Sequence, residues 1–510
     1  MKQQALIGMD IGTTSTKAVA FDMEGKMLFR EAIEYPIIST QPDYAEQDPE
    51  VVLKAVLDTL STVALELKIL GVELMGVSFS SAMHSLIAVD AQGDPLTKCI
   101  IWADTRSKVY ATNLKGSVIG HDIYLHTGTP LHPMSPLPKL RWLRDHEPLL
   151  FKNTVKFIGI KEYVFFRLFG EYKIDYSIAS ATGLFNIFKF DWHLDSLELA
   201  GITKDKLSEP VPPTHTFRNM KPDYATLLNI PATVPFVIGA SDGCLANLGS
   251  NAVRPGDAVV TIGTSGAVRV MANEPATDIQ ERIFSYILTS KRFVLGGAVN
   301  NGGVVLRWFR DNFYASETAL AAQENEDIYE LMNKRAAAVP PGADGLIFLP
   351  YLLGERAPIW DPAARACFFG VHYNHTREHF LRALMEGVMF NVYSVGRALE
   401  QTTGPIAAIY ANGGFSRSDL WVQMLADIFN KEVHLTDTHE GSAFGAVIMG
   451  MYALGLITNL EDAAAMIRVK KTFVPDPKLH SRYMQNFSLF NELYPKLKDC
   501  LHKASHHIGA

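Results

Sequence analysis

The chain begins with two short apolar runs separated by a polar turn. Residues 6–11 and 18–21 are largely apolar, and Gly12 to Ser15 between them read Gly-Thr-Thr-Ser. Two such runs joined by a short glycine-containing turn predict a β-hairpin, which a third run at 26–32 extends into a meander. An apolar run, Gly-Thr-Ser and a second run return at 258–272. We therefore expect a weak internal repeat with two related halves.

Helical periodicity alternates with these runs. Asp48 and Pro49 are typical of a helix start, and apolar residues recur on one face of residues 49–70. We expect further strands at 74–80, 86–89, 97–101, 234–240, 292–299, 407–411 and 433–435. We expect further helices at 160–172, 304–313, 377–401, 416–429, 443–457 and beyond 480. Strands alternating with helices predict an α/β fold.

Two local features add detail to this pattern. Prolines cluster at 127–138, which predicts a rigid loop. Ser416 and Asp419 are spaced as a capping box and are expected to open the helix that ends at residue 429.

The length of 510 residues predicts two or more domains. A segment with proline and glycine at 251–256 leads into the second hairpin. We therefore place the division after Gly249, with an N-terminal domain of 1–249 and a C-terminal domain of 250–510.

Composition excludes several classes of function. The hydrophobic content of 48% and the charged content of 20% are typical of a soluble globular enzyme. The net charge of −7 offers no basic surface for nucleic acid. The four cysteines are far apart without Cys-x-x-Cys spacing, which argues against zinc and a disulfide framework and favours a reducing compartment.

The chain start shows no signal-peptide pattern, and the longest apolar stretch, 443–457, is too short to span a bilayer. We therefore expect a cytoplasmic protein without membrane or nucleic-acid partners. The oligomeric state, a homodimer included, stays open.

The turn of the first hairpin has the chemistry of a phosphate site. A glycine lets the backbone approach a ligand closely, and successive backbone N–H groups form an anion-binding nest. Asp10 precedes the turn and suits a hydrated Mg²⁺. The candidate phosphate-binding residues are Gly12, Thr13, Thr14, Ser15 and Lys17 in the first half, with Gly263 and Thr264 in the second. An ordinary hairpin with a polar turn is the alternative, but the repeat favours Mg-ATP.

Glycines also follow a strand in the second half. Gly413 and Gly414 offer a surface without side chains, against which a nucleotide ring can lie. A tight strand–helix turn is the alternative explanation. Gly302, after the strand at 292–299, and Ser418 complete the candidate nucleotide contacts.

Asp242 is the candidate catalytic base. It follows the strand at 234–240, and α/β sheets bind ligands at the carboxyl ends of their strands. A carboxylate there could accept the proton of an attacking alcohol, or join Asp10 in holding Mg²⁺. A helix cap is the alternative, since aspartate is favoured there.

Trp102, Asp104 and Arg106 follow the strand expected at 97–101. If the strand geometry continues, alternation puts all three on one side, where they suit a polyol. A surface salt bridge beside a buried tryptophan is the alternative. His84 could bind a substrate hydroxyl, although a lone histidine is more often structural.

Together these motifs resemble the FGGY family of carbohydrate kinases over essentially the whole chain. The resemblance implies two ribonuclease H-like α/β domains, as in actin, hexokinase and heat-shock ATPases, with an ATP cleft between them. It implies that Asp242 is the base. It also implies a set of sugar-binding residues, namely Met83, His84, Trp102, Asp104 and Arg106.

Within the family, the stretches 78–90, 127–137 and 157–165 are most similar to gluconate kinases. The pentulose kinases have glutamine before Met-His where this chain has Ala82, which disfavours a ketopentose. The resemblance implies phosphorylation of gluconate by ATP with Mg²⁺, and Lys161 or Arg106 could hold the carboxylate. The alternatives are a xylulose or other polyol kinase, an actin- or heat-shock-like ATPase without a sugar acceptor, and a sugar-sensing pseudo-kinase.

Overall fold

The computed structural model describes residues 2–437 and 440–508. The chain forms two compact units, which we describe separately. Unit 1 consists of Met1–Pro255, Met271–Leu295 and Thr438–Arg468, and unit 2 of Gly256–Val270, Gly296–Asp437 and Val469–Ala510. No helix of the described ranges is long and apolar enough to cross a membrane. The division of the sequence after Gly249 stays a prediction.

A six-stranded mixed sheet forms the centre of unit 1, in the order β13-β14-β5-β1-β2-β3. These strands are β1 Gln4–Ile11, β2 Ser15–Asp22, β3 Met27–Glu34, β5 Glu73–Ser81, β13 Thr216–Phe217 and β14 Phe236–Ser241. The antiparallel meander β1-β2-β3 is the predicted one, and β1, β5 and β14 are parallel. The parallel strands therefore end at one edge of the sheet, where Asp10, the end of β5 and Ser241 lie.

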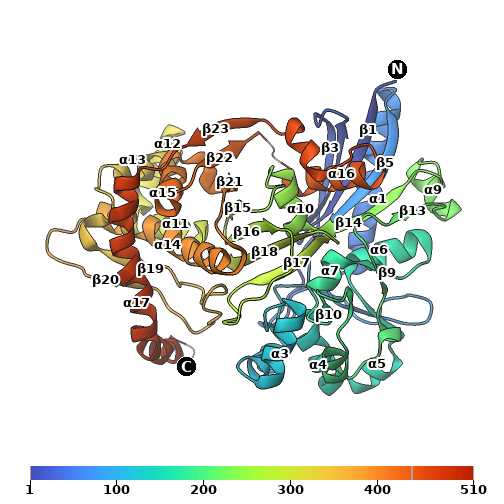
Figure 1. The fold of residues 1–510 in the computed structure, drawn as a ribbon, viewed down its shortest axis with the longest axis horizontal. Helices are drawn as coiled ribbons and strands as arrows, with labels where there is room; N and C mark the ends of the chain where they lie inside the picture. The colour runs from blue at the N-terminus through green and yellow to red at the C-terminus, as the bar shows by residue number, and fades with distance from the viewer. Residues whose placement is uncertain (1, 438–439, 509–510) are drawn as a thin grey trace. The chain divides into compact units, whose positions relative to one another are not determined.

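Helices cover this sheet. α1 (Pro49–Ile69) begins at the predicted cap, because the Asp48 side chain accepts a hydrogen bond from Glu50 N. α16 (Gly441–Ala453) comes from the far end of the sequence and packs against β1, β5 and α10 (Asp242–Gly249). Figure 1 shows this red helix beside the blue strands. The backbones come close because Gly445 has no side chain: a Cβ there would lie 1.9 Å from the carbonyl oxygen of Leu245.

The proline-rich stretch is only partly a loop. α3 (Val118–Thr127) ends in it and α4 (Pro136–His146) begins in it, because proline is tolerated in the first turn of a helix. The prediction of a loop over 127–138 is therefore wrong at both ends. The other elements of unit 1 are β4 Glu46–Gln47, β6 Ile87–Val89, β7 Cys99–Ile100, α2 Lys108–Leu114, α5 Pro148–Asn153, β8 Lys156–Ile158, α6 Ile160–Phe169, β9 Lys173–Asp175, α7 Tyr176–Ser180, β10 Phe185–Asn186, β11 Asp191–Trp192, α8 Leu194–Ala200, η1 Lys204–Lys206, β12 Glu209–Val211, α9 Pro222–Leu228 and η4 Leu460–Met466.

The second sheet has seven strands in the order β17-β18-β16-β15-β21-β22-β23. They are β15 Asp257–Ile262, β16 Gly266–Ala272, β17 Phe284–Thr289, β18 Arg292–Val299, β21 Ala408–Asn412, β22 Val433–Thr436 and β23 Val469–Phe473. An antiparallel hairpin, β15–β16, again adjoins two parallel neighbours, β21 and β22. This is the arrangement of β1, β2, β5 and β14, so the predicted repeat is confirmed.

The long helix α14 (Arg377–Thr403) confirms the periodicity at 377–401. The capping box from Ser416 is wrong: Ser416 lies in the 3₁₀ turn η3 (Gly414–Arg417), and Ser418 caps α15 (Asp419–Phe429) by accepting from Trp421 N. The other elements of unit 2 are α11 Gly303–Phe313, α12 Ala315–Glu324, α13 Ile328–Ala337, η2 Ala343–Gly345, β19 Ile347–Leu349, β20 Cys367–Phe369 and α17 Pro477–Ile508.

Candidate active site

The carbonyl groups of the turn between β1 and β2 accept hydrogen bonds from the protein itself. Gly12 N donates to Ser15 O at 2.9 Å, and Tyr35 Oη donates to Gly12 O at 2.8 Å. Gln47 Nε2 donates to Thr13 O at 2.5 Å. Carbonyl oxygens repel phosphate. Because these carbonyls are occupied by hydrogen bonds within the protein, the turn is suited to bind an anion through its N–H groups. Thr14 also lies in this turn, and its carbonyl oxygen accepts from Tyr35 N.

Asp10 lies at the end of β1, directly before this turn. Ser80 Oγ donates to Asp10 Oδ1 at 2.8 Å. Burial raises the pKa of Asp10, and the Ser80 hydrogen bond and the charge of Lys17 oppose the rise. A partly buried carboxylate with a raised pKa gains from a cation, and an oxygen ligand of this kind suits Mg²⁺. Asp10 therefore fits a metal ligand, and Ser80 orients it.

Lys17 is opposite Asp10 in the hairpin, and its partner is a residue that the sequence did not suggest. Its Nζ lies 2.9 Å from Glu440 Oε2, and Arg30 Nε lies 2.8 Å from Glu440 Oε1. Glu440 immediately precedes α16, more than 400 positions from Lys17 along the chain. The Glu440 carboxylate therefore holds both cations beside the β1–β2 turn.

Asp242 is the first residue of α10, at the carboxyl end of β14. The side chain that caps α10 is Ser241, whose Oγ accepts from Cys244 N at 3.4 Å. The alternative that Asp242 is the helix cap is therefore wrong. Its Oδ1 accepts from Gly243 N at 2.6 Å. The helix N-terminus also favours a negative charge at this position.

Lys161 lies behind this junction. Its Nζ is 2.6 Å from Asp175 Oδ2 and donates to Ala240 O at 3.1 Å. Burial lowers the pKa of Lys161, and Asp175 is the largest opposing influence. The ammonium thus supports the end of β14, two residues before Asp242.

His84 lies after β5 with a left-handed backbone, φ 70°. Its Nδ1 is 2.7 Å from Ala181 O, so this nitrogen carries the proton and Nε2 of the neutral ring is an acceptor. The imidazole ring lies edge-on to that of Tyr286, with centroids 6.1 Å apart. Met83 is partly buried in the adjacent apolar cluster.

The expected one-sided array of Trp102, Asp104 and Arg106 is wrong, because β7 ends at Ile100 and strand alternation does not continue. Asp104 is buried and binds Arg106, with Nη2 to Oδ2 at 2.7 Å. Glu46 holds the same guanidinium at 2.6 Å. The indole Nε1 of Trp102 donates to the hydroxyl of Thr13 at 2.8 Å and joins the segment after β7 to the β1–β2 turn.

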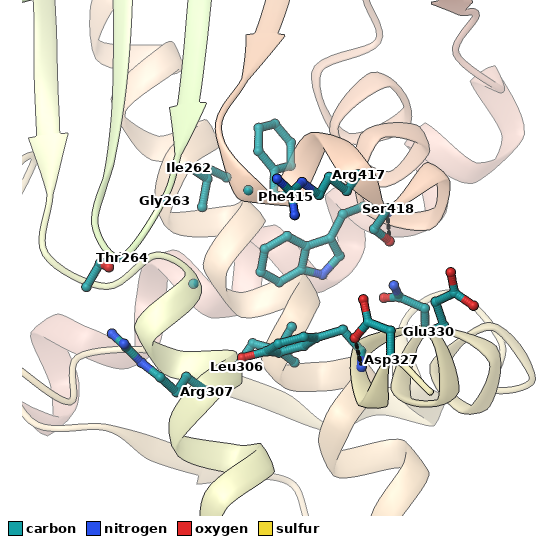
Figure 2. Close-up of a pocket in the computed structure, with 15 residues that line it drawn as sticks. Ile262, Gly263, Thr264, Leu306, Arg307, Asp327, Glu330, Phe415, Arg417 and Ser418 are labelled. Atoms are coloured by element: carbon teal, nitrogen blue, oxygen red, sulfur yellow. Dashed lines mark hydrogen bonds between the residues drawn. The ribbon is translucent and has the colours of Figure 1, made fainter. Parts of the chain in front are cut away.

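Unit 2 carries a pocket of about 520 Å³ (Figure 2). Phe415 and Arg417 form one wall, and Leu306 and Arg307 of α11 lie opposite them. Its lining includes four of the predicted nucleotide residues, namely Gly263, Thr264, Gly414 and Ser418. Sequence reasoning missed the aromatic and polar residues that complete the lining, among them Tyr329, Asn333 and Trp421.

Two other predicted glycines lie beside this pocket. Gly413 has φ 95° and ψ 179°, a conformation open only to glycine, and a Cβ would lie 2.5 Å from Ile262 O. A Cβ at Gly302 would lie 2.7 Å from Ser265 O. Both glycines therefore permit close contact of turns. The pocket combines flat backbone, aromatic surface and a few polar groups, which suits a nucleoside.

Comparison with known proteins agrees with this geometry. The FGGY family of carbohydrate kinases matches through its N-terminal domain at residues 5–249 and its C-terminal domain at residues 258–454. A gluconokinase of Bacillus subtilis (strain 168) is 48% identical over 463 residues, 91% of this chain and 90% of that protein.

Two solved structures from Lactobacillus acidophilus are also similar. A gluconate kinase has a TM-score of 0.92 at 34% identity and covers 97% of this chain and 98% of its own. A ligand-bound xylulose kinase has a TM-score of 0.93 at 35% identity and covers 98% and 99%. The chain belongs to the FGGY family of carbohydrate kinases.

Proposed function

We propose that this protein is a gluconokinase, which transfers the γ-phosphoryl group of ATP to the terminal hydroxyl of gluconate. The observation that carries the proposal is the 48% identity to a gluconokinase over nearly the full length of both chains. Ala82 supports it, because the pentulose kinases have glutamine at the corresponding position. The nearly equal likeness to a xylulose kinase structure makes xylulose the second substrate to test.

Asp242 is the proposed base. Its carboxylate orients the acceptor hydroxyl and takes the proton as the new P–O bond forms and the bond to the departing ADP oxygen breaks. The products are 6-phosphogluconate, ADP and a proton. The position of Asp242 at the end of β14 and the start of α10 supports this role, since the capping requirement is met by Ser241.

The substrate groups are proposed to bind the residues assembled in unit 1. His84 Nε2 accepts a hydrogen bond from a hydroxyl group of the sugar acid, and the Trp102 indole offers an apolar face. Lys161 is the proposed partner of the gluconate carboxylate. Because Lys161 also forms an ion pair with Asp175, its ammonium would be shared between Asp175 and the substrate. Arg106 is engaged by Asp104 and Glu46 on two sides.

The β1–β2 turn with Lys17 is proposed to bind phosphate groups. The pocket of unit 2 is proposed to bind a nucleoside. Asp10, and Asp242 as a second candidate, would hold Mg²⁺, which when bound offsets phosphate charge. The cytoplasmic location and a homodimer stay predictions.

A coupled ADP-release screen tests the function. The purified enzyme should turn over ATP with gluconate much faster than with xylulose, ribulose or glycerol, and barely without an acceptor. Turnover with xylulose but not gluconate would overturn the substrate. Equal turnover without any acceptor would favour the ATPase alternative.

A further inference from the structure

A second buried lysine of unit 1 lies behind the sugar-binding residues. Lys139 is on α4, and its side chain is completely buried. Its Nζ donates to three backbone carbonyl oxygens, those of His84 at 2.7 Å, Ile101 at 2.8 Å and Ile100 at 3.3 Å. An ammonium has three donors, so the three carbonyls use all of them.

These carbonyls belong to the two segments that carry the proposed sugar contacts. His84 is itself one of those residues, and Ile101 directly precedes Trp102. The Ile101 carbonyl also accepts from Asp104 N at 3.1 Å, which closes the turn that contains Trp102. One ammonium therefore joins the backbone of the histidine segment to that of the tryptophan turn.

The backbone of His84 makes this tie consequential. Its φ of 70° is uncommon for a residue with a side chain, and such a strained conformation persists only where its surroundings hold it. The hydrogen bond from Lys139 to the carbonyl of the same residue holds that conformation from one side, and the bond from the imidazole to Ala181 O holds it from the other.

Lys139 differs from its cationic neighbours in the groups that its side chain contacts. Arg106 and Lys161 lie against carboxylates, whereas the Lys139 donors are used by neutral carbonyls. Burial lowers the pKa of Lys139 to about 7, and Asp104 is the largest opposing influence. A buried cation of this kind is costly, and a nonpolar residue of similar volume would avoid that cost.

We propose that Lys139 is a positioning residue for the acceptor substrate: it ties the His84 backbone to the Trp102 turn and sets the distance between their side chains. It does not touch the substrate. This inference rests on the proposed function for the identity of the sugar acid, and on the contacts above for the role of the lysine.

Lys139→Met is the principal test, because methionine has a similar volume and no donors. KM for gluconate should rise at least tenfold, while KM for Mg-ATP stays within twofold. Lys139→Gln, which keeps two N–H donors, should give an intermediate value. KM does not depend on the fraction of active enzyme, so partial unfolding cannot produce this split.

Lys156→Met is the matched control. Lys156 Nζ also donates to a backbone carbonyl, that of Leu207 at 2.7 Å, in another part of unit 1. This variant should leave both KM values unchanged. An unchanged gluconate KM in Lys139→Met, an equal rise for both substrates, or failure of both Lys139 variants to fold would overturn the positioning role. If the wild type rejects gluconate, the proposed function fails, and the same comparison with the accepted sugar still decides the role of Lys139.

Discussion

Replacing Asp242 by asparagine separates the chemical role of this residue from its structural one. The amide oxygen of asparagine can still accept from Gly243 N, and Ser241 still caps α10. The substitution removes the negative charge near the helix N-terminus, which contributes about 0.3–1 kcal/mol. A protein stable by about 5–15 kcal/mol stays folded after such a loss.

The kinetic effect should be much larger. A positioned general base contributes roughly 10²–10⁴-fold to the rate, which corresponds to about 3–5 kcal/mol of the activation free energy. The kcat of Asp242→Asn should therefore fall by about that factor. The affinity for Mg-ATP should change little, since Asp10 is the first candidate for the Mg²⁺ ligand; a large loss of affinity would instead assign Asp242 to the metal. Coupled ADP release at saturating substrates measures kcat, and calorimetry measures nucleotide binding.

Ser241→Ala is the control for this experiment. Loss of a cap costs typically about 1 kcal/mol, so this variant should lose more thermal stability than Asp242→Asn and retain far more kcat. If Asp242→Asn kept more than about a tenth of the wild-type kcat, against the 10²-fold minimum expected of a base, the residue would not be the base.

Three further substitutions test other parts of the structure, namely Lys17 and Gly413 of the candidate site and Glu162 in the first turn of α6. Lys17→Met should lower kcat/KM at least tenfold, because the charge that stabilises the phosphates in the transition state is lost. Loss of the ion pair with Glu440 should cost under about 1 kcal/mol of stability. A variant with a lower melting temperature and an unchanged kcat/KM would show that the hairpin is only structural. Burial raises the pKa of Glu162 from 4.5 to about 7. Between pH 4.5 and 7 the folded state therefore keeps a proton that the unfolded state has released, and the stability of the wild-type protein falls as pH rises through this range. Glu162→Gln should therefore stabilise the protein at pH 8, by up to about 3 kcal/mol, with a gain that shrinks toward pH 5 in thermal melts; a constant gain would contradict the titration. Gly413→Ala places a Cβ against Ile262 O in a glycine-only conformation and should raise KM for ATP roughly tenfold or more while KM for gluconate stays unchanged.

Local patterns in the sequence were enough to predict much of the secondary structure. The two hairpins, the capped start of α1 and the long α14 follow from turn residues, capping preference and periodicity within about ten to twenty residues. The position of Asp242 at a strand end was predictable for the same reason. Errors arose where neighbouring residues competed, as when Ser418 rather than Ser416 became the cap of α15.

Other features depend on residues far apart in the sequence. α16 looks like any buried helix, and nothing in its periodicity places it beside β1. The contact depends on Gly8 of β1, where a Cβ would lie 2.1 Å from the carbonyl oxygen of Ala443 in α16. The pairing of Glu440 with Lys17 follows from that packing.

The sugar segment shows the same limit. Strand alternation predicted that Trp102, Asp104 and Arg106 lie on one side, whereas the fold pairs Asp104 with Arg106 and the Trp102 indole donates to Thr13. Lys139 carried no signal, because a lysine in an amphipathic helix normally faces solvent. Local patterns and motifs were thus enough to predict most of the strand–helix order, the two hairpin turns and the family. The identity of the buried charges and of their partners depends on packing, because an ionised group that loses its water must be paired with whatever groups the fold brings to it, at any distance along the chain.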